Sequence, residues 1–226
     1  MRKIIDETNA VFAQAAAEVA ALIARKPDAV IGVTEVDMPE AFFTALRESG
    51  ASFADATFCN ACELAGEAGQ GAQSQQAKLR ALLYDAVQPK QVLLPDAEDY
   101  DAAIRAAGGM DLVVLGLGER GHIAYDEPGV DFGAGTHENK LADVTRGALA
   151  EAFGGLENVP THGVTIGIAT ILAAKRVLLL AFGENKANAA QKTLEGRPET
   201  YIPASFLQLH TDVTVYLDHA AASKLG

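Results

Sequence analysis

The sequence predicts an α/β protein in which a mostly parallel sheet carries helices on both faces. Several short runs are apolar throughout, as is typical of strands covered on both sides, and these runs alternate with segments of helical periodicity. The clearest run is Asp-Leu-Val-Val-Leu-Gly at 111–116. Because the chain contains neither a low-complexity linker nor an internal repeat, we expect one domain over residues 1–226.

The first half of the chain alternates helix and strand. Apolar residues recur at helical spacing over 7–25, and Pro27 ends that pattern. A short apolar run at 29–34 has the length of a buried strand, and Pro39 suits the first turn of a helix. The remaining expectations here are a helix over 39–48, a strand over 52–59, a Gly/Ala/Gln-rich loop over 67–75 and a leucine-spaced helix over 76–86.

The second half repeats the alternation more clearly, with glycines closing two of its helices at 108–109 and 196. The expected strands span 91–94, 111–116, 163–167, 176–182 and 212–217. The expected helices span 97–107, 169–174 and 184–194, followed by a helical turn at 204–209.

Composition narrows the class of partner. The chain has 18 Lys+Arg against 30 Asp+Glu, a net charge of −12, and no visible basic run, so we expect neither a nucleic acid nor an anionic membrane as a partner. It shows no signal-peptide pattern and no apolar run of about 18 residues. Two cysteines are too few for a disulfide framework. Together these features predict a cytoplasmic protein.

The segment after the clearest strand is the strongest candidate for chemistry. Gly116, Gly118 and Gly121 allow a sharp turn and a close approach to a ligand, so we assign them to substrate binding. His122 lies five residues before Glu127, and an imidazole near a carboxylate is a usable acid/base pair. The alternative is a glycine-rich turn with an exposed histidine. A dinucleotide fingerprint would need a helix at the third glycine, which the following Tyr-Asp-Glu-Pro-Gly does not allow.

Residues 111–129, ending Gly-His-Ile-Ala-Tyr-Asp-Glu-Pro-Gly, resemble the signature of glucosamine-6-phosphate deaminases (isomerases). The related 6-phosphogluconolactonases share the Gly-x-Gly-x-x-Gly-His part but not the Glu-Pro. Further similar segments lie at 165–172, 183–187, 194–196 and 205–210. The resemblance implies a Rossmann-like fold and an enzyme of carbohydrate metabolism that converts an aldose amino-sugar phosphate to a ketose phosphate. It also implies a sugar or sugar-phosphate ligand, no cofactor or metal, and a possible homo-oligomer.

The same resemblance assigns roles to individual residues. It implies that His122, supported by Glu127, opens the sugar ring, and that Lys186 near a helix N-terminus binds phosphate. Without the resemblance, Lys186 would be interpreted as a solvated helix residue.

The chain departs from the family pattern at the catalytic base and at an Asp that, in the family, belongs to the proton relay around the histidine. Cys62 takes the position of the family's base Asp, next to Glu63, and Arg120 replaces an Asp two residues before His122. We therefore assign Cys62 to catalysis, and Glu63 and Arg120 to substrate binding. Arg120 would favour a neutral His122 ring and could help Cys62 to act as a thiolate base. The alternatives for Cys62 are an inert buried thiol, a redox pair with Cys59, or half of a metal site completed by a histidine such as 137 or 162.

The phosphate loop also departs from the family. Where relatives have a Gly/Ser/Thr-rich turn, this chain has Glu35 and Asp37. A carboxylate about 4 Å from a phosphate charge costs on the order of 4 kcal/mol per unit-charge pair at an effective dielectric of 20. The pair could instead receive an amino or hydroxyl group of a sugar. The sequence therefore leaves open a divergent isomerase, an inactive sugar-binding relative and, less favoured, a lactonase.

Overall fold

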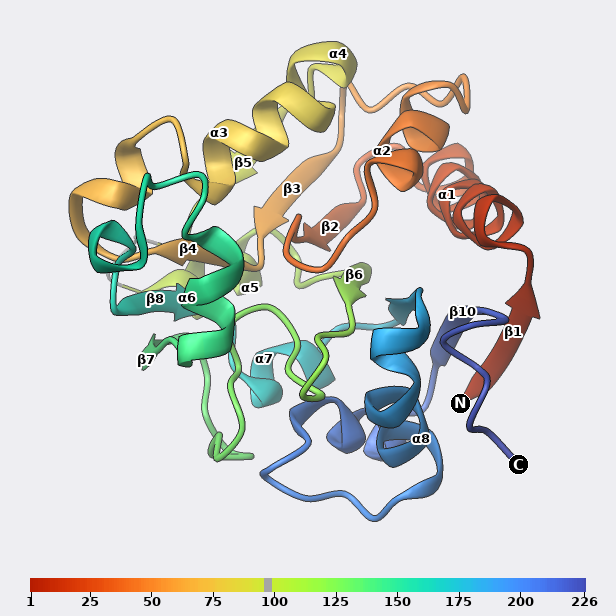
Figure 1. Cartoon of the computed structure of the whole chain (residues 1–226). Coiled ribbons are helices and arrows are strands. Elements are labelled where there is room, and N and C mark those ends of the chain that lie inside the picture. Colours follow the sequence, from red (N-terminus) through yellow and green to blue (C-terminus); the bar gives the residue numbers. More distant parts are fainter. Residues whose placement is uncertain (96–98) are drawn as a thin grey trace.

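A computed structural model describes residues 1–95 and 99–226 and shows the expected α/β architecture (Figure 1). Within these residues a seven-stranded sheet has the order β1-β10-β9-β6-β2-β3-β5, and every neighbouring pair is parallel. Its strands are β1 (Arg2–Asp6), β2 (Val30–Val33), β3 (Thr57–Asn60), β5 (Gln91–Leu93), β6 (Leu112–Gly116), β9 (Val177–Ala181) and β10 (Val213–Asp218).

Helices cover both faces of this sheet, as predicted. The α-helices are α1 (Thr8–Arg25), α2 (Glu40–Arg47), α3 (Gln75–Leu79), α4 (Asp85–Val87), α5 (Tyr100–Ala106), α6 (Asp143–Leu149), α7 (Ile168–Leu172) and α8 (Ala187–Glu195). A π-helical turn (Arg80–Tyr84) joins α3 to α4, and 3₁₀ turns lie at Gly66–Gln70, Leu156–Asn158, Glu184–Lys186 and Pro203–Leu209. Both termini lie beside the β1–β10 edge of the sheet (Figure 1).

Alternate residues of the central strands point to two separate cores. Ile31 and Val33 of β2 pack in one core with α1, α2 and the α3 segment. Val113 and Leu115 of β6 pack in the other core with α5, α7, α8 and the 3₁₀ turn at Pro203–Leu209. This division is the pattern of a parallel sheet that is buried on both faces.

A second, antiparallel sheet of three strands lies beside the main one, in the order β4-β8-β7. It contains β4 (Cys62–Leu64), β8 (His162–Thr165) and β7 (His137–Lys140). The strand expected at 163–167 forms, but as β8 in this small sheet rather than in the main sheet. We did not expect β4, β7 or β1, because β7 reads His-Glu-Asn-Lys and β1 begins Arg-Lys, and neither has an apolar run.

Three element boundaries differ from the expectation. The strand expected over 52–59 begins only at Thr57, after a turn, and the leucine-spaced helix is interrupted by the π turn. Residues 67–70 of the expected loop form a 3₁₀ turn. The start of the helix expected at 97 lies outside the described residues, and α5 begins at Tyr100 after Asp99, whose side chain accepts a hydrogen bond from the Ala102 amide. In the part of the chain that is described, no helix is long and apolar enough to cross a membrane.

Candidate functional site

A cavity of about 290 Å³ opens where the chain leaves the carboxyl ends of β2 and β6. Glu35 and Asp37 enter it from the turn after β2, and His122 from the glycine-rich loop after β6. Lys78 of α3 and residues of α6 complete the wall. Parallel α/β sheets bind ligands outside the carboxyl ends of their strands, and the sequence predicted a site at this position.

The three glycines of the loop make room for protein atoms rather than for a ligand. A Cβ on Gly116 would lie 2.3 Å from the carbonyl oxygen of Asp37, and one on Gly118 would lie 2.0 Å from the ring of His122. Gly121 has a φ of +77° and packs against Ile202. The loop therefore holds the β2 turn and His122 close together, and substrate binding by these glycines stays a prediction.

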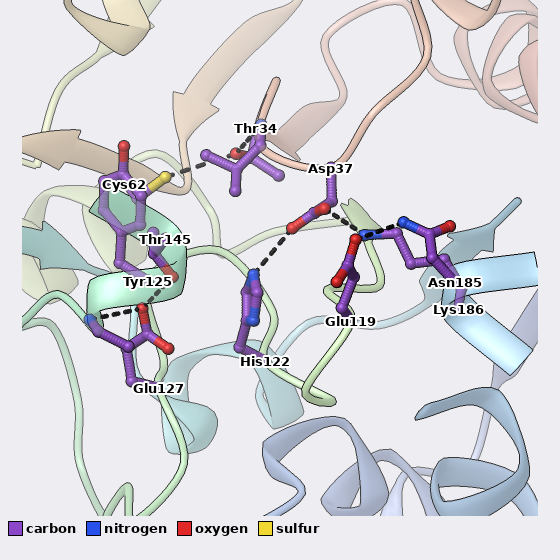
Figure 2. Close-up of polar contacts among 12 residues, drawn as sticks. Thr34, Asp37, Cys62, Glu119, His122, Tyr125, Glu127, Thr145, Asn185 and Lys186 are labelled. Carbon is purple, nitrogen blue, oxygen red and sulfur yellow. Dashed lines mark hydrogen bonds and ion pairs between the residues drawn. The ribbon is translucent and has the colours of Figure 1, made fainter. Parts of the chain in front are cut away.

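His122 is paired with Asp37, not with Glu127 as we expected (Figure 2). Its Nε2 lies 2.8 Å from Asp37 Oδ2, and the ring is buried with 6% exposure. An ionised carboxylate only accepts hydrogen bonds, so Nε2 carries the proton and donates it. The Nδ1 atom of His122 is buried and finds no hydrogen-bond partner among the described residues.

Asp37 also holds Lys186, so one carboxylate bridges the histidine and the lysine (Figure 2). Burial alone would raise the pKa of Asp37, but the hydrogen bond and charge of His122 and the charge of Lys186 outweigh it, leaving the pKa below its usual 3.8. Asp37 is therefore ionised at neutral pH. Lys186 is 5% exposed, so its interpretation as a solvated helix residue is wrong.

Glu127 is turned toward α6. Its Oε1 accepts hydrogen bonds from the Thr145 hydroxyl, at 2.5 Å, and from the Ala142 amide at 3.1 Å. These contacts hold the amino-terminal end of α6, which forms part of the cavity wall, against the loop that carries His122. Glu127 thus supports the site through α6, and the structure shows no hydrogen bond from it to His122 among the described residues.

Cys62 is unsuited to act as a base. Its side chain is buried with 1% exposure, and its sulfur lies 3.4 Å from the Thr34 hydroxyl. Burial raises the pKa of the thiol well above its usual value, and the nearby charges of Glu63 and Glu35 raise it further. The expectation of an activating cation is wrong at this position, because the charges around Cys62 are carboxylates.

The other chemistry considered for the cysteines also lacks a basis in this geometry. Both thiols are free, and burial raises the pKa of Cys59 to about 12. Within the described residues, no group of three or more His, Cys, Asp or Glu side chains is placed to hold a metal ion.

Glu63 and Arg120 lie away from the cavity. Glu63 caps α3: its carboxylate accepts the amides of Gln75 and Gln76, each at 2.8 Å, and burial raises its pKa. Arg120 is exposed and lines a different hollow, together with Lys192 and other residues, and its expected effect on His122 stays a prediction.

Glu35, in contrast, faces the cavity as predicted and is paired with Lys78 at 2.7 Å. Sequence reasoning missed Lys78, because a lysine on an amphipathic helix carries no signal of its own. It also missed Thr145, whose contact with Glu127 depends on the fold of the segment after β7. Asp37 was identified as a site residue, but its pairing with His122, 85 residues away, could not be derived from spacing.

The chain resembles proteins of known classification over nearly its whole length. A family model described as glucosamine-6-phosphate isomerases/6-phosphogluconolactonase matches residues 6–216. The glucosamine-6-phosphate deaminase of Bacillus velezensis is 37% identical over 224 residues, covering 92% of this chain and 93% of the relative. The deaminase of Listeria welshimeri is 38% identical over 203 residues, covering 86% of this chain and 87% of that protein.

Solved structures agree with this placement. A monomeric glucosamine-6-phosphate deaminase superposes with a TM-score of 0.91 at 34% identity, covering 99% of this chain and 100% of that chain. The 6-phosphogluconolactonase of Trypanosoma brucei has a TM-score of 0.77 at 17% identity, covering 100% of this chain and 98% of that chain, and therefore shares the fold. The chain belongs to the glucosamine-6-phosphate isomerase/6-phosphogluconolactonase family, as a divergent relative of its deaminases.

Proposed function

We propose that this protein is an enzyme that opens the ring of an aldose amino sugar and isomerises it to a ketose, in the manner of its deaminase relatives. The observation that carries the proposal is the His122–Asp37 pair, 2.8 Å apart at the wall of a 290 Å³ cavity. The pair supplies a carboxylate that can accept and return a proton, held by a histidine, although Arg120 replaces the Asp that we expected two residues before His122.

Ring opening requires a proton to leave the anomeric hydroxyl and another to reach the ring oxygen. The ionised carboxylate of Asp37 is able to accept the first proton and, held by the Nε2–H of His122, to return it as a carboxylic acid to the ring oxygen, so that His122 keeps its own proton. Lys186 stabilises the carboxylate in its charged form. His122 and Asp37 thus take the ring-opening role that we expected for His122 and Glu127.

Isomerisation further requires a base for a carbon-bound proton. Cys62 is buried and its thiol stays protonated at neutral pH, so we assign this step to a carboxylate that lines the cavity. Glu35 is the candidate, because it faces the cavity and does not hydrogen-bond to His122. Its pairing with Lys78 at 2.7 Å positions it at the cavity wall.

The test is turnover of glucosamine and of glucosamine 6-phosphate, followed by release of ammonia and formation of the ketose. We expect His122→Ala to lower kcat/KM by about 10²–10⁴-fold, the range for loss of general acid–base catalysis, because Asp37 loses the partner that positions it. His219→Ala is the matched control, because His219 is an exposed histidine that lies outside the cavity lining. Wild-type protein that binds these sugars without releasing ammonia or forming a ketose would contradict the proposal.

A second candidate function is sugar binding without catalysis, and the buried Cys62 favours it. A family position that needs an ionised base holds a neutral thiol in this chain. This candidate predicts ligand-dependent stabilisation of about 2.7 kcal/mol at a ligand concentration of 100 Kd. It predicts no turnover by either wild type or His122→Ala.

A further inference from the structure

Behind the cavity wall lies a buried cation that a carboxylate of the protein neutralises. Lys186 is 5% exposed, and its ammonium contacts Oδ1 of Asp37. A buried ammonium requires a negative partner, and here that partner comes from the chain. Figure 2 shows the Asp37 carboxylate between Lys186 and His122, so its two oxygens are engaged by two different side chains.

The backbone at Asp37 indicates that this carboxylate is held in place at some cost. Asp37 has a φ of +56°, a left-handed conformation that favours glycine over residues with a side chain. The turn is also confined, because Gly116 lies directly against the Asp37 carbonyl. A strained backbone conformation persists where the residue's contacts outweigh the strain, and the side-chain contacts of Asp37 are those with His122 and Lys186.

The remaining charges of the cavity are unfavourable to an anion. Glu35 and Glu119 also line it, and Lys78, which belongs to its wall, is paired with Glu35 at 2.7 Å. With Asp37 included, the lining carries three carboxylates, against the ammonium groups of Lys78 and of Lys186 behind Asp37. A phosphate would have to displace Asp37 from Lys186 or lie among carboxylates.

We propose that Asp37 is a built-in anion that takes the place of a ligand's phosphate on Lys186, so that the cavity binds an amino sugar without a phosphate. This inference rests on the proposed function for the class of ligand and reverses the family's preference for a phosphorylated one. The ligand's ammonium group is attracted by Glu35 and Glu119, and its hydroxyl groups meet Asp37 and His122.

The test compares glucosamine, glucosamine 6-phosphate and inorganic phosphate by titration calorimetry and by the shift in Tm. For wild type we expect glucosamine to bind at least as tightly as glucosamine 6-phosphate, and phosphate alone to give no shift. Asp37→Gly frees Lys186 and suits the positive φ, so it should fold. We expect this variant to bind phosphate at least tenfold more tightly than wild type and to prefer glucosamine 6-phosphate over glucosamine.

Two further variants separate a local effect from a general one. Asp37→Asn removes the charge but keeps the side chain, and we expect a smaller gain in phosphate affinity. Glu48→Gln removes an exposed carboxylate that lies outside the cavity lining, and we expect it to leave the preference for glucosamine unchanged.

Three results would overturn the inference: tenfold tighter binding of glucosamine 6-phosphate than of glucosamine by wild type, no gain of phosphate binding in Asp37→Gly, or no binding of either sugar by wild type. Binding is measured apart from turnover. Lack of catalysis with retained glucosamine binding therefore contradicts the proposed function and not this inference.

Discussion

Asp37 combines an unfavourable backbone conformation with two charged hydrogen bonds. The positive φ opposes the side chain, and the contacts with His122 and Lys186 favour it. Hydrogen bonds to charged groups contribute about 1.5–3 kcal/mol each, whereas a left-handed residue costs roughly 1–2 kcal/mol. The balance therefore depends on the ionisation of the Asp37 carboxyl.

This dependence predicts how Asp37→Asn changes stability with pH. The folded-state pKa of Asp37 is below its usual 3.8, so its contribution is fully present above that value and is lost as the pH falls through the lowered pKa. We expect Asp37→Asn to lower the free energy of unfolding by about 1–3 kcal/mol at pH 7. The gap between the two proteins should narrow below pH 3.8. Urea titrations of both at pH 7, 5 and 3 measure it, and a constant gap would contradict the assignment.

Cys62 leads to a prediction of the opposite kind, because we expect its side chain to be dispensable for turnover. Its sulfur packs in the core and contacts Thr34. We expect Cys62→Ala to cost about 1–2 kcal/mol of stability from the small cavity it leaves, and to change kcat/KM by less than threefold.

Glu35→Gln is the contrasting variant, because it removes the carboxylate that we assign to the carbon-bound proton. We expect it to lower kcat by at least 100-fold with folding intact. The measurement is steady-state turnover of all three proteins, together with their melting curves. If Cys62→Ala loses turnover as severely as Glu35→Gln, the thiol has a catalytic role after all.

At the scale of elements, α3 is held in place by Glu63, a side chain that we expected to bind substrate. Glu63 of β4 accepts two amides at the start of α3, and Gln75 in the same turn donates to the Tyr125 hydroxyl at 2.7 Å. These bonds attach the small sheet and the loop that carries His122 to the helix that carries Lys78. A buried carboxylate at a helix N-terminus also suits the helix dipole.

We therefore expect Glu63→Ala to lower the free energy of unfolding by about 2–3 kcal/mol, since it leaves buried amides without partners. Ligand affinity should fall only through the displacement of Lys78. Hydrogen exchange of the amides of residues 75–79 should increase in this variant, while exchange in α1, which packs in a core with β2, should change little. Unchanged exchange at residues 75 and 76 would show that the cap contributes nothing.

The elements also show what a single sequence reveals. The long helix α1 and the strands β2, β6, β9 and β10 could be predicted because their apolar patterns are continuous. The polar strand β7 could not, because its order comes from pairing with β8. Of the site, His122 and Asp37 could be identified by position, but the bond between them depends on how β2 and β6 lie side by side.

In the whole molecule, the candidate site and a buried stabilising cluster lie at opposite ends of the strands of the main sheet. The cavity lies at the carboxyl ends of the strands, whereas Asp111 precedes β6 at the opposite end. Asp111 is buried and accepts hydrogen bonds from Lys26 at 2.5 Å, Lys175 at 2.7 Å and the Val30 amide at 2.9 Å. It therefore joins the end of α1, β2 and the turn before β9.

Asp111→Asn should destabilise the protein without altering its site. Burial would raise the pKa of Asp111, but the hydrogen bonds of Lys175 and Lys26 lower it below 3.8, so its contribution is present at neutral pH and lost in acid. We expect a loss of about 2–3 kcal/mol at pH 7 with unchanged ligand affinity.

Asp37 and Asp111 lie at opposite ends of the strands and share no hydrogen-bond partner among the residues that the structure describes. The double variant Asp37→Asn/Asp111→Asn should therefore lose the sum of the two single losses in free energy of unfolding, within about 0.5 kcal/mol. Urea titrations of the four proteins at pH 7 complete this cycle. A coupling energy well above that value would mean that strain passes along β2 and β6 from one end of these strands to the other. In that case the cavity could not be altered independently of the framework that holds it.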